Sequence, residues 1–211
     1  MIPEDLEILK HFITVLVPLI IIMDPFGNLP FFLLFTKGKT RLERTKTAAI
    51  ASGVACLILI FFSITGDAVL SFFHIGLPAF QIAGGFIFFM YALQLLHLIP
   101  GGIRSTEEEE QEGIAKEHVA LVPLATPLLA GPGAITAVLV WQQSYDIPFN
   151  LFTLTAAIGA ACLAVFCTFF LGEWILRILG IGGIRVITRI MGLVLAVIAV
   201  QFMVDGFMQL R

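Results

Sequence analysis

Charged side chains are scarce in this sequence of 211 residues. Asp, Glu, Lys and Arg together make up 13%, about half of what a soluble domain carries. Apolar residues make up 59%, and the mean hydropathy is +1.01. A soluble fold of this length needs a charged surface that the sequence does not supply. We therefore expect an integral membrane protein.

Other absences narrow the function. The sequence has no phosphate-binding glycine loop, so we expect any energy coupling to come from an ion gradient. The four histidines fall near the ends of apolar runs, and neither a histidine nor a Ser–Lys set accompanies the one deep carboxylate. An intramembrane hydrolase is therefore disfavoured. We expect no enzyme activity, no metal, no cofactor beyond a coupling proton or sodium ion, and no nucleic-acid partner.

The apolar residues form runs of about 20, the length of a helix that crosses the bilayer core, whereas a barrel would show short alternating segments. The first run is too long, and the residues before it too acidic, for a cleavable signal peptide. The fold class that we predict is an all-α membrane protein with six transmembrane helices, at 12–36, 48–66, 77–98, 119–142, 151–171 and 187–207.

Ten of the twelve basic residues fall between spans one and two, three and four, or five and six. The last of these groups comprises Arg177, Arg185 and Arg189. Because retained Lys and Arg mark the cytoplasmic side, we expect both termini outside, in a multi-pass protein of the cytoplasmic (inner) membrane. Residues 100–118, which include the run Glu107 to Glu110, are expected to form a polar, acidic cytoplasmic linker.

Three spans precede this linker and three follow it, so the two halves, 1–99 and 119–211, would have opposite orientations. A displacement of 106 residues pairs span two with span five and gives seven identities over the 21 positions from Thr47 to Asp67. Similar displacements pair Pro25 with Pro132 and Gly85 with Gly192. Internal similarity of this kind indicates duplication, so we predict two inverted three-helix repeats.

Spans one and four contain the sequences "MDPFGNLP" (23–30) and "TPLLAGPGAIT" (126–136). Proline and glycine should break both helices near mid-depth. A broken backbone is tolerated in a membrane only where protein or a watery cavity surrounds it. Matched interruptions in inverted halves are typical of a transporter's substrate site, and their helix N-termini favour an anionic group.

Asp24 is costly at mid-bilayer and needs a partner or water. It is either a cation, proton or ammonium site or the N-cap of a helix that begins at Pro25, and the two roles are compatible. Asn28 is interpreted as a cavity-lining residue or a helix–helix hydrogen-bonding residue. The hydroxyls of Thr126 and Thr136 either face the site or bond to their own helix.

Further polar and small residues lie in spans three and six. Gln81, Gln94 and Gln201 either line the cavity or bridge helices. Arg189 is interpreted as a cytoplasmic anchor, with a substrate-carboxylate clamp or a partner for Asp24 as the alternative. Gly84, Gly85 and Gly192 are interpreted as close-packing positions rather than ligands.

Together, "DPFGNLPFF", "PLATPLLAGPGAIT" and "RIMGLVLAVIAVQFMVDG" resemble segments of the MarC/SnatA-type membrane protein family, within the LysE-like superfamily of inverted repeats. The resemblance covers nearly the whole chain and implies transport of small neutral amino acids such as glycine and alanine. The site residues it implies are Asp24, Pro25, Gly27, Asn28, Pro30, Pro127, Gly131, Pro132, Gly133, Arg189, Gly192 and Gln201. To these the sequence pattern adds Thr126, Thr136 and Gln81.

The sequence thus predicts a secondary transporter with a small-molecule substrate, in contact with the lipid bilayer and of undetermined oligomeric state. Two other classes stay open. Cys56 and Cys162 are paired by the repeat, as in six-span thiol and electron carriers, although buried cysteines usually serve in packing. A passive channel is the other alternative.

Overall fold

The computed structural model describes residues 4–72, 74–98, 124–126, 129–143 and 150–210. Its regular structure in these ranges is entirely helical, as the composition predicts. The helices are α1 (Glu4–Met23), α2 (Pro25–Phe35), α3 (Arg41–Phe72), α4 (Leu77–Leu95), α6 (Pro132–Gln143), α7 (Asn150–Phe170) and α8 (Gly172–Gln209). The predicted linker, 100–118, lies outside the described residues.

Four of the described helices are long and apolar enough to cross a membrane, namely α3, α4, α7 and α8. The bent pair α1 and α2 makes a fifth candidate. Predicted span four does not pass the same test, because α6 is only 12 residues long, about 18 Å of helix against a bilayer core of about 30 Å. Part of that span, 119–123 and 127–128, lies outside the described residues.

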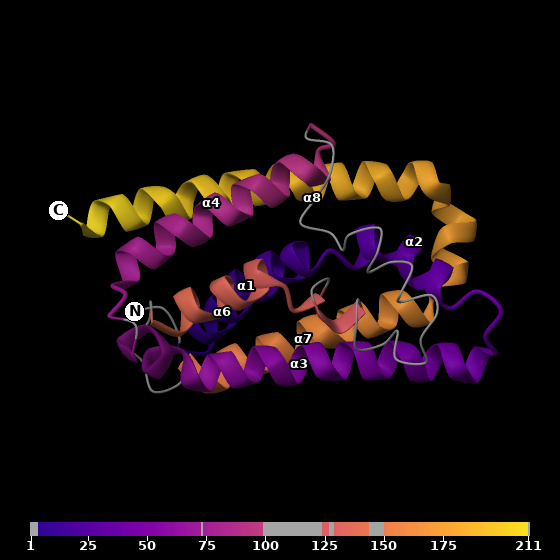
Figure 1. The fold of residues 1–211 in the computed structure, drawn as a ribbon, viewed down its shortest axis with the longest axis horizontal. Helices are drawn as coiled ribbons and strands as arrows, with labels where there is room; N and C mark the ends of the chain where they lie inside the picture. Colours follow the sequence, from indigo (N-terminus) through magenta and orange to yellow (C-terminus); the bar gives the residue numbers. More distant parts are fainter. Residues whose placement is uncertain (1–3, 73, 99–123, 127–128, 144–149, 211) are drawn as a thin grey trace.

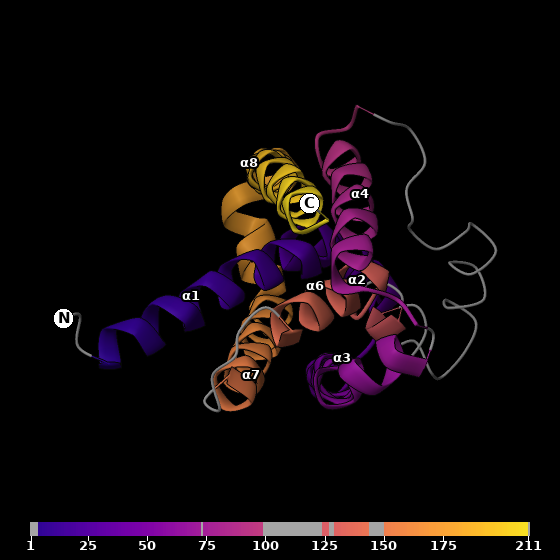
Figure 2. The same cartoon turned by 90° about the vertical axis from the view of Figure 1, so that its left-hand side faces the viewer.

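The long helices pack as two pairs. Helix α4 lies along α8, and α3 lies along α7. Helices α2, α6 and the end of α1 next to α2 lie between the two pairs, whereas the N-terminal part of α1 projects from the bundle (Figures 1 and 2). Each inner helix contacts at least one of the pairs, and α1 also contacts α6. The interrupted helices predicted from the sequence therefore occupy the interior of the bundle.

Large apolar side chains remain exposed on the outer helices, among them Leu57 and Phe61 on α3, Phe86 on α4, Leu163 on α7 and Val197 on α8. In water such a surface would aggregate, whereas lipid covers it at no cost. Glycines at the contacts between helices, such as Gly85 and Gly192, are buried instead. A β-carbon at Gly192 of α8 would lie 2.8 Å from Leu95 Cβ, so this glycine permits the close approach of α4 and α8.

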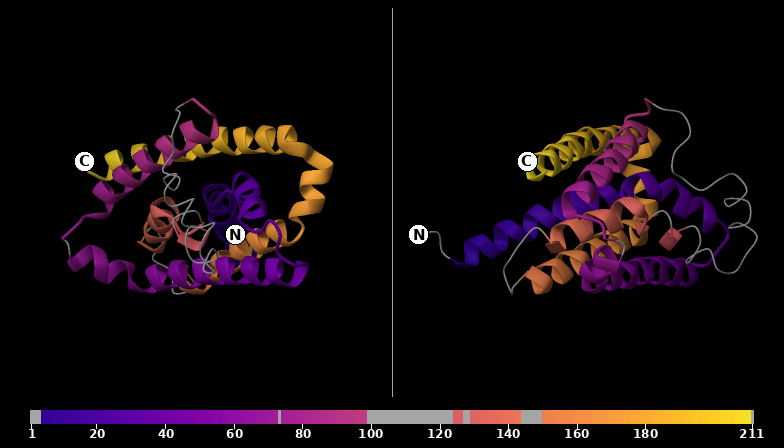
Figure 3. Two further views of the ribbon diagram at one scale, coloured as in Figure 1. Left: turned by 45° about the vertical axis from the view of Figure 1, so that its right-hand side comes forward. Right: turned by 60° about the vertical axis from the view of Figure 1, so that its left-hand side comes forward.

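Two predicted boundaries are wrong. The second span begins at Arg41, not at 48, although it ends at Gly66 as predicted within a helix that continues to Phe72. Helix α8 begins at Gly172, not at 187. Arg177, Arg185 and Arg189 therefore lie in a helix rather than in a loop, because arginine is a good helix former. The chain turns at Gly180, whose φ of 62° and ψ of 178° are available to glycine and to few other residues. Figure 3 shows the resulting corner between α7 and the long part of α8.

Candidate functional site at two interrupted helices

The first interruption is one residue wide. Asp24 separates α1 from α2 with left-handed dihedrals, φ 42° and ψ 64°, and the two helices meet at a bend of 40°. Its carboxylate Oδ1 accepts a hydrogen bond from the Gly27 amide at 2.9 Å, and Pro25 occupies the first position of α2. The N-cap predicted for Asp24 is confirmed. Because the Asp24 side chain is fully buried, this cap sits inside the bundle.

Asn28 holds the two half-helices together. Its Nδ2 donates to the Met23 carbonyl, the last of α1, at 2.9 Å. Its Oδ1 is buried and accepts no hydrogen bond from any residue that the structure describes. A buried acceptor without a donor costs about 1–3 kcal/mol. Asn28 therefore offers a polar atom, beside the break, that a ligand or a water molecule can satisfy.

The neighbouring residues of the first motif are arranged for this turn. Pro25 and Gly27 are buried, and Pro30 lies half-buried inside α2. A β-carbon at Gly27 would overlap the Asp24 carboxylate. Glycine at position 27 therefore allows the carboxylate to fold back onto the helix N-terminus.

The second interruption lies before α6. Residues 124–126 form a π-helical turn, and the Ala130 amide donates to the Ala125 carbonyl at 2.9 Å. Helix α6 then begins at Pro132, and Gly131 accepts from the Ile135 amide at 3.1 Å. Of the predicted residues here, Thr126 and Gly131 are half-buried, Pro132 is exposed, and Pro127 lies outside the described residues.

The two interruptions meet. A β-carbon at Gly133 in the first turn of α6 would lie 3.4 Å from Ile22 Cγ2, two residues before Asp24. Leu129 and Ala130, before α6, belong to the same buried cluster as Met23 and Leu29, which flank Asp24. Both breaks therefore face the interior, and in this conformation apolar side chains pack closely around them.

Two further predicted residues, Thr136 and Gln81, use their polar side-chain atoms in hydrogen bonds within the protein. The Thr136 hydroxyl donates to the Pro132 carbonyl in its own helix at 2.8 Å, and its methyl group packs against Gly84 of α4. Gln81 of α4 is buried, and its Oε1 accepts from Gln209 of α8 at 3.1 Å. For Gln81 the structure favours bridging between helices over lining a cavity.

The remaining predicted residues lie away from the breaks. Gln201 is exposed and donates to Asp205 on its own helix at 2.7 Å, and Arg189 is exposed on α8. Gly192 is buried against α4, in the close-packing role expected for it. The structure thus does not bring these three residues to the interrupted helices.

The sequence repeat also paired Cys56 with Cys162, and the structure brings these two side chains into contact between α3 and α7. They form no disulfide. Cys162 is buried and Cys56 is half-buried, on helices other than the interrupted ones.

Comparison with known proteins agrees with a multi-pass helical bundle. The model of the MarC family of integral membrane proteins matches residues 9–210. This chain belongs to the MarC family. A UPF0056 membrane protein of Aquifex aeolicus is 37% identical over 199 residues, which are 94% of this chain and 93% of the relative.

Two other relatives of this chain come from a bacterium and an archaeon. The UPF0056 membrane protein YhcE of Escherichia coli is 35% identical over 88% of this chain and 86% of its own. A UPF0056 membrane protein of Methanocaldococcus jannaschii is 35% identical over 94% of this chain and 96% of its own. No solved structure matches this chain significantly.

Proposed function

We propose that this MarC-family protein is a secondary transporter of small neutral amino acids, of the size of glycine or alanine. Substrate would bind where the two interrupted helices meet and would be exposed to each side of the membrane in turn. The observation that carries the proposal is that residues next to the two interruptions contact each other and share one buried apolar cluster. Unwound backbone at such a place is typical of transporter sites.

The groups at the breaks suit a zwitterion. Helix α6 begins at Pro132, so the Gly133 and Ala134 amides in its first turn have no acceptor within the helix, whereas the Ile135 amide donates to Gly131. Together with the helix dipole they favour a carboxylate. The Asn28 Oδ1 and the Asp24 carboxylate lie at the start of α2, where acceptors suit an ammonium group, a proton or a sodium ion. The carboxylate of an amino acid would thus bind at the start of α6, and its ammonium group at the start of α2.

The size of the substrate follows from the packing. Ala130, Gly131, Gly133 and Ala134 line the entry into α6, and Leu129 and Leu29 are at most 1% exposed. Space for a ligand must come from small displacements of these side chains. A methyl or hydrogen side chain would fit such a space, whereas an aromatic one would force the helices apart.

The arrangement of pairs is compatible with inverted repeats. Helices α3 and α7, which the sequence repeat aligns, lie along each other, as do α4 and α8. We therefore retain the inverted three-helix halves, with both termini outside the cytoplasmic membrane, as part of the proposal. An ion gradient would supply the driving force.

The proposal is tested by exchange and uptake of labelled glycine and alanine in proteoliposomes under imposed proton or sodium gradients. Asp24→Asn is the informative variant, because asparagine caps a helix about as well as aspartate but carries no charge. Asp205→Asn is the matched control, since Asp205 bonds Gln201 on the outer helix α8. We expect Asp24→Asn to lose gradient-driven accumulation at least tenfold while it keeps some exchange.

A channel would give flux without saturable counterflow, and counterflow in the unmodified protein would exclude it. If neither glycine, alanine nor any other amino acid in a panel exchanges, the transporter proposal fails. If Asp24→Asn accumulates substrate as well as Asp205→Asn does, Asp24 serves only as a cap.

The contact between Cys56 and Cys162 favours a second candidate, a membrane thiol carrier. Such a carrier would pass two electrons and two protons between a dithiol and a disulfide as the pair opens and closes. Replacing both cysteines by alanine decides between the two functions. Amino-acid transport that persists in this variant excludes the thiol carrier. Dithiol–disulfide exchange across the membrane that the unmodified protein supports and the variant loses would favour the carrier.

A further inference from the structure

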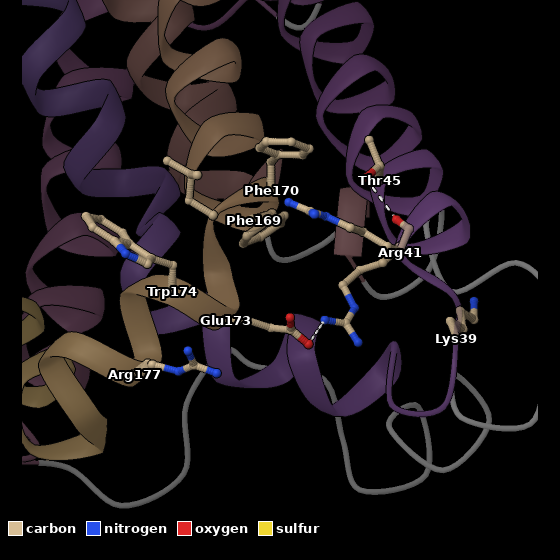
Figure 4. A pocket seen from close by; sticks show the side chains of 10 residues that line it. Lys39, Arg41, Thr45, Phe169, Phe170, Glu173, Trp174 and Arg177 are labelled. Atoms are coloured by element: carbon tan, nitrogen blue, oxygen red, sulfur yellow. Dashed lines mark hydrogen bonds and ion pairs between the residues drawn. The ribbon is translucent and has the colours of Figure 1, made fainter.

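A cavity of about 430 Å³ lies beside α2, at the end away from Asp24, and Phe169 in its wall stacks on Phe32 of α2 (Figure 4). It is formed where α7 ends, α8 begins and α3 begins. Its wall consists of Lys39, Arg41, Arg44, Thr45, Phe169, Phe170, Leu171, Glu173, Trp174 and Arg177. Neither the internal repeat nor the proline and glycine motifs point to this place.

The cavity carries a surplus of positive charge. Four basic side chains line it, against one carboxylate. Arg44 forms an ion pair with Glu173, while its Nε is buried and has no acceptor among the described residues. Arg41 lies over the Phe170 ring at 6.0 Å from the centroid. Like charges gathered around a cavity repel one another, so an anion placed between them would be stabilised.

The start of α8 adds to this preference. Leu171 precedes the helix and provides no side-chain cap. The first amides of α8 therefore lack a side-chain acceptor beside the cavity, and the helix dipole adds partial positive charge there. A phosphate group combines the charge and the several acceptor oxygens that arginines and amides bind best.

The surroundings of the cavity are apolar and exposed. Phe170, Leu171 and Trp174 on its rim are 47%, 44% and 61% exposed, and Ile178 continues this surface along α8. One candidate membrane span ends here at Phe170 and another begins at Arg41. Tryptophan and arginine at the end of a span are typical of the headgroup level. The neighbouring apolar surface is suited to an acyl chain.

We propose that this cavity binds the phosphate headgroup of an anionic phospholipid, with the lipid chains along Phe170, Trp174 and Ile178. The site is separate from the transport site, and its occupant would hold the beginnings of α3 and α8 together. Each basic residue near a membrane surface contributes about a fivefold gain in affinity for anionic lipid.

The fluorescence of Trp174, which lies in the cavity wall, measures whether a lipid is bound there. The sequence has two tryptophans, and in a Trp141→Phe background only Trp174 reports. The protein is reconstituted in phosphatidylcholine vesicles that contain 10 mol% brominated phosphatidylglycerol or, in a second arm, 10 mol% brominated phosphatidylcholine. We expect at least threefold stronger quenching of Trp174 by the brominated anionic lipid.

The variants are matched in charge. Arg41→Gln with Arg177→Gln should remove the preference for the anionic lipid, whereas Arg185→Gln with Arg189→Gln, outside the cavity on α8, should keep it. Equal quenching by both lipids in the unmodified cavity would overturn the proposal. So would equal loss of preference in both double variants, which would show a general effect of charge.

Inorganic phosphate separates the two sources of the anion. If millimolar phosphate abolishes the preference at constant ionic strength, the cavity binds a soluble anion and the lipid proposal is wrong.

A thermal shift in detergent provides a second readout that needs no Trp141→Phe change. Short-chain phosphatidylglycerol should raise the melting temperature of the unmodified protein, and the same concentration of short-chain phosphatidylcholine or phosphate should not; no rise with phosphatidylglycerol would contradict the proposal.

Discussion

Asp24 illustrates how one side chain makes a buried helix break tolerable. Its carboxylate satisfies the Gly27 amide, and its own carbonyl accepts from the Asn28 amide at 3.0 Å. The Asn28 side chain then satisfies the last carbonyl of α1. Three backbone groups that the break would leave without partners, the Met23 and Asp24 carbonyls and the Gly27 amide, are thus paired within the six residues 23–28. Such pairing is what an apolar environment demands.

Gly27→Ala tests this local arrangement, because a β-carbon at position 27 would overlap the capping carboxylate. Asp24 would have to swing away and lose the cap, so we expect a loss of about 1–2 kcal/mol of stability. Thermal unfolding in detergent measures it. Gly53→Ala on α3, where nothing lies within 4 Å, is the control and should be neutral or slightly stabilising. Equal melting temperatures for the two variants would contradict the overlap.

At the scale of single helices, the sequence predicted the features that depend on residues adjacent in the chain. The break at Asp24, its cap and the break within residues 126–136 follow from residues adjacent in the chain, and all three are found. The beginning of α8 was missed, because basic residues that indicate a loop by charge are also good helix formers. The basic cavity was missed because positions 39–45 meet 169–177 only in the fold.

The polar residues of the long helices show the same limit. A glutamine in a membrane helix satisfies its amide wherever the fold supplies a partner. Gln81 finds Gln209 on another helix, whereas Gln201 finds Asp205 on its own. The sequence left both interpretations open, since helix partners and rotation are set by tertiary packing.

Gly180 sets the corner in α8, and its replacement tests that corner. Its φ of 62° and ψ of 178° cost other residues about 1–3 kcal/mol. No atom lies within 4 Å of a β-carbon placed there, so Gly180→Ala should be destabilising by backbone strain alone. Gly182→Ala, two residues on and equally open, is the control. Similar unfolding temperatures would show that the helix runs straight through the corner.

At the scale of the whole molecule, the inner and outer helices differ in how they are held. The outer pairs α4–α8 and α3–α7 make the most extensive contacts between helices, with Gly85 and Gly192 allowing close approach. The inner helices α2 and α6 have only 11 and 12 residues, and each starts at a break. Exposing the substrate site to one side of the membrane and then the other therefore breaks the fewest contacts if the inner helices move while the outer pairs stay fixed.

A disulfide across the breaks tests this division. Gly133 and Ile22 are suitable positions, because a β-carbon on Gly133 would lie 3.4 Å from Ile22 Cγ2 and bonded cysteines have β-carbons about 4 Å apart. In a background without Cys56, Cys162 and Cys167, the pair Ile22→Cys and Gly133→Cys should stop amino-acid exchange on oxidation and regain it on reduction.

The control pair is Leu95→Cys and Gly192→Cys, which links α4 to α8. A β-carbon on Gly192 would lie 2.8 Å from Leu95 Cβ, so the two helices must separate by about 1 Å in this variant, oxidised or reduced, to admit the side chains. Cross-linking in both pairs is verified by counting free thiols. If the inner helices alone move, the oxidised control exchanges amino acids as fast as its reduced form. A disulfide blocks transport only if it joins parts that must move relative to each other. Amino-acid exchange that continues with the disulfide between positions 22 and 133, or stops with the disulfide between positions 95 and 192, would show that the outer pairs move instead.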